Sequence, residues 1–159
     1  AEDTTPTLPV LQHAVRTVEQ AGETYDAICL LQPTNPLRTP DLIDGCIELF
    51  ETGRADSVVS VLPVPHQYNP HWVYLTDADG CLKLSTGEPY PIPRRQDLPK
   101  AFHREGSVYV VKRGVLMEEN SLYGARVMGF PVDPSRSVNI DSTEDLEKVE
   151  AMLTAGSAL

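Results

Sequence analysis

Apolar residues along this chain occur in two alternating patterns, helical spacing and short continuous runs. Residues 8–20 carry apolar side chains at helical spacing, and Gly22 ends that helix. Residues 27–31 form an uninterrupted apolar run, which is typical of a strand covered on both faces. A second helix begins at Pro40, and a second apolar strand follows at 57–62. This order predicts an α/β fold with a mainly parallel sheet, right-handed crossovers and helices on both faces.

The pattern changes after Pro63, where prolines and polar residues interrupt regular structure. Two short apolar segments flank the turn residues 77–80, which indicates a β-hairpin. The prolines between residues 88 and 99 exclude regular strands. We interpret residues 65–102 as an excursion from the main sheet, so that residues 1–159 form a single domain.

Regular patterns resume in the last third of the chain. Residues 107–111 read as a strand, 126–132 as another, and 137–140 as a brief last strand. Ser142 and Asp145 have the spacing of a helix cap, and the apolar residues that follow predict a final helix.

Composition narrows the class of partner. The length of 159 residues suits one compact domain, and the formal charge of −10 argues against a nucleic-acid or anionic membrane surface. The three cysteines lack metal-ligand spacing and fit a reducing, cytoplasmic setting. No apolar run reaches membrane-spanning length.

Candidate chemistry gathers directly after the first strand, where open α/β sheets bind ligands. Gln32 can donate and accept hydrogen bonds, and Thr34 adds a short polar group. Arg38 adds a planar fork suited to phosphate or carboxylate. The plain alternative is an ordinary strand-to-helix turn held by two prolines.

Four further candidates each have a structural alternative. Asp141 lies between a strand end and a capped helix, where a carboxylate can bind Mg²⁺ or simply complete the turn. Arg94 and Arg95 lie on a proline-held loop and can bind an anion bidentately, although solvated basic loops are commoner. Tyr109 faces either a pocket or the core, and the core is the commoner place. His71 lies in a loop, where exposed histidines are commoner than ligand contacts.

Taken together, three segments resemble motifs of the acylneuraminate cytidylyltransferases, also called CMP-sialic acid synthetases. Residues 30–38 resemble LLQPTSPLR, with Asn35 in place of Ser. Residues 95–110 resemble RQxLPxxFxxNGAIYI, and residues 139–146 resemble DIDTxEDL. The resemblance covers nearly the whole chain, and residues 32–34 argue against the related synthetase for the eight-carbon acid Kdo, whose first motif is acidic.

The resemblance implies a Rossmann-like nucleotidyltransferase that forms a CMP-sugar from CTP and a nine-carbon sugar acid such as N-acetylneuraminate, with release of pyrophosphate. Carried over, Gln32 contacts the sugar, Arg95 binds its carboxylate and Tyr109 lines the sugar pocket. Asp141, with Asn139, holds Mg²⁺, which neutralises charge during phosphoryl transfer. The remaining predicted substrate-binding residues are Thr34, Arg38, His71, Arg94 and Gln96. The family's members are dimers, so the resemblance also implies a homodimer in which the excursion reaches the partner subunit.

Departures from the family motifs leave alternatives open. Asn139 stands where many members have Asp, and Glu105 places a negative charge where the family has Asn. His71 occupies the place of a basic residue that helps to hold sialic acid. Legionaminic or pseudaminic acid is therefore an alternative substrate, and a non-catalytic sugar-binding or interaction module is an alternative function.

A further departure concerns the beginning of the family's sequence. The family starts with a strand and a loop rich in Gly, Arg and Lys that holds the CTP triphosphate, and no segment here matches it. We therefore expect a piece of a longer protein or a processed product, inactive by itself, that associates through an uncovered sheet edge or face.

Overall fold

The computed structural model describes residues 5–154. The opening residues 1–3, which contribute to the expectation of a longer protein, lie outside the described part of the chain. Two compact units are present. The first comprises the chain up to Val61 and from Glu105 onward, and the second is Leu62–Arg104. The second unit comprises nearly the same residues as the predicted excursion, 65–102.

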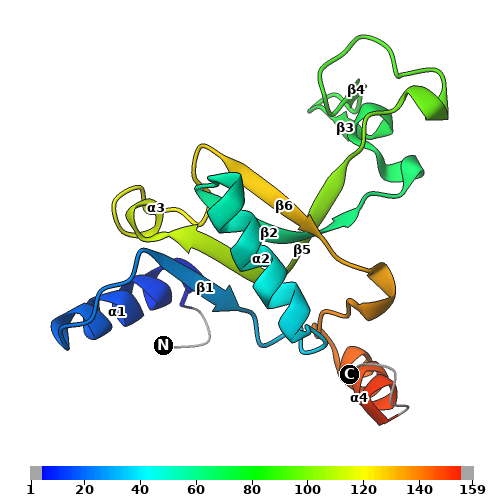
Figure 1. Cartoon of the computed structure of the whole chain (residues 1–159). Coiled ribbons are helices and arrows are strands. Elements are labelled where there is room, and N and C mark those ends of the chain that lie inside the picture. Colours follow the sequence, from blue (N-terminus) through cyan, green and yellow to red (C-terminus); the bar gives the residue numbers. More distant parts are fainter. Residues whose placement is uncertain (1–4, 155–159) are drawn as a thin grey trace. The chain divides into compact units, whose positions relative to one another are not determined.

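A four-stranded sheet forms the first unit, in the order β1-β5-β2-β6 (Figure 1). Its strands are β1 (Ala27–Leu31), β2 (Ser57–Pro63), β5 (Phe102–Lys112) and β6 (Val127–Pro131). β1 pairs antiparallel with β5, and β2 pairs parallel with β6. The predicted mainly parallel α/β fold is confirmed, because β1, β2 and β6 share one direction and β5 alone runs against them.

The direction of β5 against β2 follows from hydrogen bonds along both strands. The Lys112 N–H donates to the Asp56 carbonyl at 3.0 Å, and the Val108 N–H donates to Ser60 Oγ at 3.0 Å. The residue numbers on β5 decrease from 112 to 108 while those of their partners increase from 56 to 60, which is the register of an antiparallel pair. The hydroxyl of Ser60 thus accepts the Val108 N–H between the two central strands.

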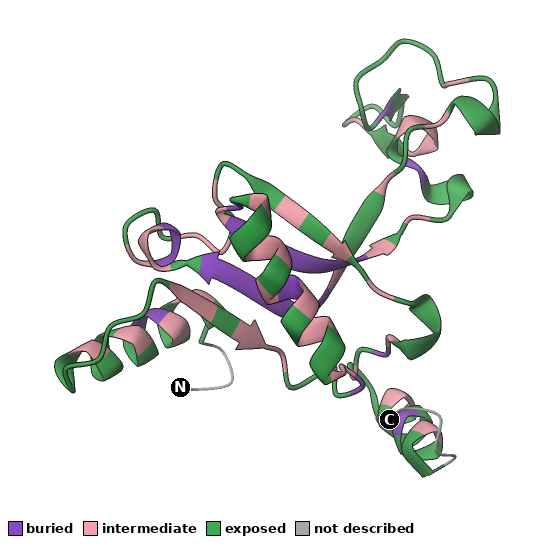
Figure 2. Cartoon of the chain, in the orientation of Figure 1, coloured by how far each residue is buried: buried purple, intermediate pink, exposed green. Residues whose placement is uncertain are grey.

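Helices cover both faces of this sheet, as expected. Helix α2 (Pro40–Gly53) covers one face through Cys46, against Val58 and Val108. The opposite face packs against α1 (Thr7–Gln20) and α3 (Arg113–Met117), where Leu116 is fully buried. Figure 2 shows that burial is greatest along the central strands β2 and β5. The hydrophobic core therefore lies on these two strands.

The predicted last strand at 137–140 is wrong. This segment has no strand pairing, although Val138 is buried against Leu37 and Val149. The alternating apolar residues of this segment are buried or partly buried because they pack against α4 (Thr143–Thr154), and they do not pair with a strand of the sheet. The predicted cap of α4 is confirmed, because the Ser142 N–H donates to Asp145 Oδ2 at 3.0 Å and the Asp145 N–H donates to Ser142 Oγ at 3.3 Å.

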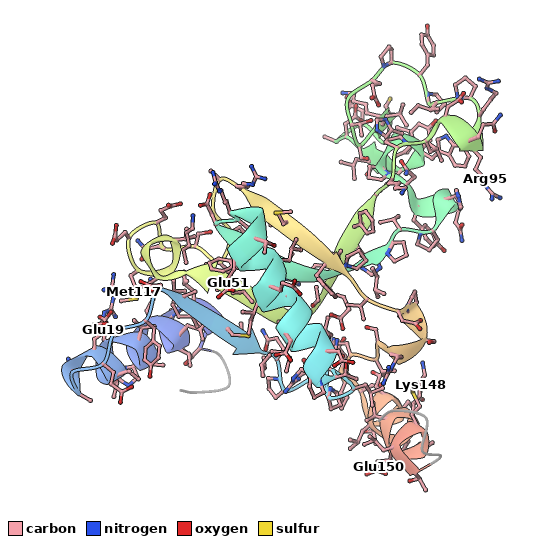
Figure 3. All side chains as sticks on the ribbon, viewed as in Figure 1. Glu19, Glu51, Arg95, Met117, Lys148 and Glu150 are labelled. Carbon is pink, nitrogen blue, oxygen red and sulfur yellow. The ribbon has the colours of Figure 1, made fainter. Side chains whose placement is uncertain are left out.

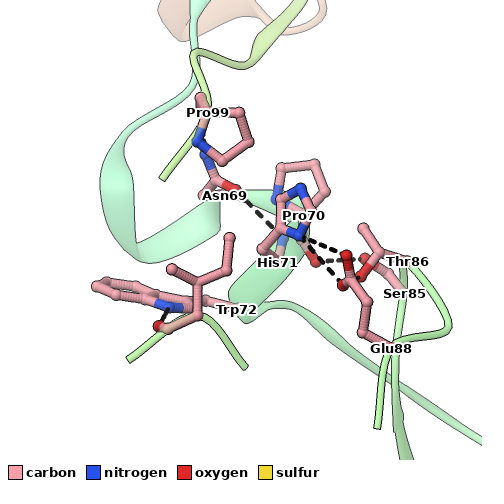
Figure 4. A network of polar contacts seen from close by, with 9 residues as sticks. Asn69, Pro70, His71, Trp72, Ser85, Thr86, Glu88 and Pro99 are labelled. Atoms are coloured by element: carbon pink, nitrogen blue, oxygen red, sulfur yellow. Dashed lines mark hydrogen bonds and ion pairs between the residues drawn. The ribbon is translucent and has the colours of Figure 1, made fainter. Parts of the chain in front are cut away.

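The second unit contains the predicted hairpin. β3 (Tyr74–Thr76) pairs antiparallel with β4 (Leu82–Leu84). Around it run three short 3₁₀ turns, η1 (His66–Tyr68), η2 (Pro70–Trp72) and η3 (Arg95–Asp97). Polar contacts hold this unit together (Figure 4): Asn69 Nδ2 donates to the Pro99 carbonyl at 2.9 Å, and Trp72 Nε1 donates to the Ile92 carbonyl at 2.7 Å.

Among the described residues, no helix combines the length and the apolar character that crossing a membrane requires.

Candidate functional site

The turn that follows β1 is closed by its own hydrogen bonds. The Gln32 N–H donates to the Ser107 carbonyl at 3.1 Å, which ties the start of the turn to β5. Arg38 Nη1 donates to the carbonyls of Gln32 and Asn35, both at 2.7 Å. One nitrogen of the Arg38 guanidinium is therefore held by backbone carbonyls of the turn itself. Gln32 is partly buried and Thr34 is exposed, at the carboxyl end of β1 as predicted.

A half-buried carboxylate lies beside this turn. Glu105 Oε1 accepts a hydrogen bond from Asn35 Nδ2 at 2.6 Å and one from Ser137 Oγ at 3.0 Å. Glu105 Oε2 accepts from the Ser107 N–H at 2.9 Å and from Ser107 Oγ at 2.7 Å. We call these four residues, Asn35, Glu105, Ser107 and Ser137, the Glu105 network. The sequence placed Glu105 near a bound sugar, whereas its carboxylate joins three segments of the chain.

The charged form of Glu105 is favoured in this setting. Partial burial alone would raise the pKa of its carboxyl group. Hydrogen bonds from Ser60, Ser107 and Ser137 outweigh that effect and lower the pKa below its ordinary value. Glu105 is therefore an anion that is satisfied by internal donors, as a buried charge must be.

The predicted metal residues lie against the same turn. The Ile140 N–H donates to the Thr34 carbonyl at 2.7 Å, which brings the segment 139–141 beside the turn after β1. Asn139 Nδ2 donates to Asp141 Oδ2 at 2.6 Å, and both side chains are exposed. Within residues 5–154 no group of three or more His, Cys, Asp or Glu side chains could hold a metal ion. Asp141 can thus offer one carboxylate, with Asn139 beside it.

Tyr109 lies in the core of the first unit. Its side chain is 4% exposed and packs with Leu30, Val59 and Val61. Its ring meets that of Tyr123 edge to face, with centroids 6.3 Å apart. This is the commoner of the two places that the sequence allowed for Tyr109.

A basic cavity of about 870 Å³ lies within the second unit. Its polar lining consists of His66, Asn69, Arg95, Gln96 and Lys100, and no carboxylate lines it. Two of its lining residues are hydrogen-bonded, because the Val64 N–H donates to the Ala101 carbonyl at 2.9 Å and so joins the two ends of the excursion. The sequence analysis named Arg95 and Gln96 as substrate-binding residues. It did not select Lys100, and for His66, as for His71, an exposed loop position was the commoner expectation.

The two adjacent arginines have different surroundings. Arg94 forms a bidentate ion pair with Asp97, with nitrogen–oxygen distances of 2.8 and 3.3 Å. Arg95 lines the cavity and is exposed at the surface of the second unit (Figure 3). The partner of Arg94 lies only three residues further along the same loop.

His71 is paired with an acidic residue of its own unit. Its Nδ1 lies 3.0 Å from Glu88 Oε1 and 3.1 Å from Oε2 (Figure 4). A hydrogen bond from Thr86, and then those from His71, lower the pKa of the Glu88 carboxyl. His71 is not among the residues that line the basic cavity.

Comparison with curated proteins gives relatives that align with almost the whole chain. The post-translational flagellin modification protein B of Campylobacter coli is 28% identical over 155 residues, which cover 96% of this chain and 64% of the relative. A CMP-N,N'-diacetyllegionaminic acid synthase of Legionella pneumophila is 27% identical and covers 96% and 65%. A pseudaminic acid cytidylyltransferase of Campylobacter jejuni is 23% identical and covers 92% and 62%. The chain therefore spans just under two thirds of the length of these relatives.

Solved structures of low sequence identity share the fold. A CMP-2-keto-3-deoxy-manno-octonic acid synthetase in complex with CTP aligns over 97% of this chain and 70% of its own, with a TM-score of 0.64 and 14% identity. A 4-diphosphocytidyl-2C-methyl-D-erythritol synthase from Anaerococcus prevotii aligns over 95% and 68%, with a TM-score of 0.64 and 10% identity. No family model matches the chain.

Proposed function

We infer that this chain, a homologue of the CMP-acid cytidylyltransferases, acts in the transfer of CMP from CTP to a nonulosonic acid. In this reaction a sugar hydroxyl attacks the α-phosphorus of CTP, a new oxygen–phosphorus bond forms, and the bond to pyrophosphate breaks. The observation that carries the proposal is the meeting of the turn 32–38 with the segment 139–141 through the Thr34–Ile140 hydrogen bond. Two segments that resemble family motifs thereby lie together at the carboxyl end of β1.

Binding of the acid is proposed for the basic cavity of the second unit. A sugar carboxylate requires donors and no competing anion, and the lining offers Arg95, Lys100 and His66 without a carboxylate. Gln96 adds an amide. Asn69 contributes little to binding, because its amide already bonds the Pro99 carbonyl and the His71 N–H. Arg95 is the residue that we propose to bind the carboxylate.

Mg²⁺ is proposed as the cofactor. The ion commonly takes one or two protein carboxylates and completes its shell with substrate phosphates and water. The exposed carboxylate of Asp141, with the Asn139 amide beside it, fits this mode without an all-protein cluster. The ion would neutralise charge on the triphosphate, and the residues of this chain would hold the ion and the turn that faces it.

The relatives favour an enzyme over a non-catalytic module, because several of them are named as synthases or cytidylyltransferases. Their names cover legionaminic, pseudaminic and N-acylneuraminic acids, so the substrate is proposed at the level of the nonulosonic acid class.

A homodimer through the second unit is also proposed. This unit exposes several large apolar side chains, among them Tyr90 at 81%, Tyr68 at 64% and Leu82 at 63%. Exposed apolar groups gathered on a small unit are typical of an interface. Sedimentation equilibrium over a range of concentrations tests this, and a monomer at all concentrations would contradict it.

The test of the proposed function is release of pyrophosphate by the full-length product of the encoding gene. CTP should support turnover with at least one of a panel of nonulosonic acids, and ATP, GTP and UTP should not. Arg95→Ala should raise KM for the acid by about tenfold or more, since it removes a bidentate ion pair with the substrate. Lys83→Ala is the matched control, because Lys83 pairs with Asp77 on the hairpin. Equal KM values for all three proteins would contradict the assignment of Arg95, and no turnover with any acid would contradict the function.

A further inference from the structure

Two departures from the family motifs contact one another in this structure. Asn35 stands where the first motif has Ser, and Glu105 stands where the second has Asn. The residues are 70 positions apart, yet Asn35 Nδ2 donates to Glu105 Oε1 at 2.6 Å. Each residue therefore provides the partner that the other one requires.

The Glu105 carboxylate has no capacity left for a substrate. Each oxygen accepts two hydrogen bonds of 3.0 Å or shorter from the Glu105 network, which together use the four lone-pair sites of a carboxylate. The Ser60 hydroxyl further favours the charged form. Two of the donor residues are almost fully buried, since Asn35 is 2% exposed and Ser107 is 1% exposed. The role of Glu105 is consequently to hold its neighbours in place.

Those neighbours belong to the segments that carry the candidate chemistry. Asn35 lies in the turn with Gln32, and Ser137 leads directly to Asn139 and Asp141. Ser107 completes the connection, because its carbonyl accepts the Gln32 N–H at 3.1 Å. One carboxylate therefore fixes the turn after β1, the strand β5 and the segment that bears the predicted metal residue.

We propose that Glu105 is a positioning residue that holds Gln32 and Asp141 in one arrangement, acting through Asn35 and Ser137. The inference rests on the proposed function, because it assigns Glu105 to the same reaction. Misplacement of reacting groups by about 1 Å can cost about 100-fold in rate. A carboxylate that bridges the two segments is a device against such misplacement.

A reciprocal exchange of the two side chains tests the proposal. Glu105→Gln replaces one acceptor oxygen by an amide N–H, which then faces the donor Nδ2 of Asn35. Asn35→Asp places a second carboxylate against Glu105. The double variant Asn35→Asp/Glu105→Gln restores one donor facing one acceptor and the original charge of the pair. Glu147→Gln, an exposed carboxylate on α4, is the matched control for loss of charge.

The assay is pyrophosphate release by the full-length protein, with kcat and KM determined separately for CTP and the acid. Glu105→Gln should lower kcat by about tenfold or more, and Asn35→Asp should lower it further. The double variant should recover most of the loss, and Glu147→Gln should match the unmodified protein. Amide exchange at Gln32 and Ile140, whose N–H groups join the turn to its neighbours, should accelerate in both single variants and slow again in the double variant.

The outcomes separate the two levels of inference. A folded Glu105→Gln protein with unchanged kcat, KM and amide exchange would overturn the positioning role and leave the proposed function intact. A double variant no better than the single variants would also overturn it, because the direct pair would then not matter. An unmodified protein that turns over no nucleotide with any acid would overturn the proposed function and the positioning role together.

Discussion

Replacing Gly45 by alanine should weaken the packing of α2 on the sheet. A Cβ added at Gly45 would lie 2.6 Å from Cζ and 2.7 Å from Cε2 of the Phe130 ring on β6, so the ring or the helix must move. Overpacking of this kind costs about 1–3 kcal/mol. The better helix propensity of alanine returns at most about 1 kcal/mol. If alanine returns the full 1 kcal/mol, the free energy of unfolding should fall by about 0–2 kcal/mol.

Gly114 on α3 offers the matched control. The nearest atom to an added Cβ there is a flexible Glu118 oxygen at 3.9 Å, so alanine meets no clash. The same substitution should raise the free energy of unfolding by about 0.5–1 kcal/mol. Urea unfolding followed by circular dichroism measures both variants. If Gly45→Ala proves as stabilising as Gly114→Ala, then the Phe130 ring moves aside without cost. The close approach of α2 to β6 would then not require glycine at position 45.

Two further predictions concern charge. The lowered pKa of Glu105 means that its charged form stabilises the folded protein above the ordinary carboxyl pKa, and that this stabilisation is lost as the pH falls through the folded-state pKa. The difference in free energy of unfolding between the unmodified protein and Glu105→Gln should therefore shrink on acidification. A difference that stays constant with pH would refute this. Removal of divalent ions by a chelator should stop pyrophosphate release, and Asp141→Asn should raise the Mg²⁺ concentration needed for half-maximal rate; an unshifted Mg²⁺ dependence would exclude Asp141 as a ligand.

Local signals in the sequence were sufficient for most elements. Proline at the first position and Thr39 before it mark the start of α2, and an apolar run without polar interruption marks β1. Such signals depend on neighbours in sequence, so they could not show that β5 enters the sheet between β1 and β2. The same limit explains the error at 137–140, where buried apolar residues pack under a helix without pairing as a strand.

The candidate site was predictable only in part, for a related reason. Residue type indicated that Arg95 and Asp141 carry suitable chemistry, and those assignments stay predictions. The neighbours of a charge decide its role, and they come from distant segments. Lys100 and His66 join Arg95 through the closure of the excursion, while Glu105 is enclosed by Asn35 and Ser137.

The place of β5 in the sheet also constrains the order in which the chain can fold. β1 and β2 are synthesised early, but the position between them belongs to a strand that ends at Lys112. Until that strand is available, each of the two carries a free edge toward the vacant position, and free edges invite pairing with other chains. The sheet is completed by contacts between residues far apart in sequence, which slows folding. The nascent chain therefore depends on its later half to protect its earlier half from aggregation.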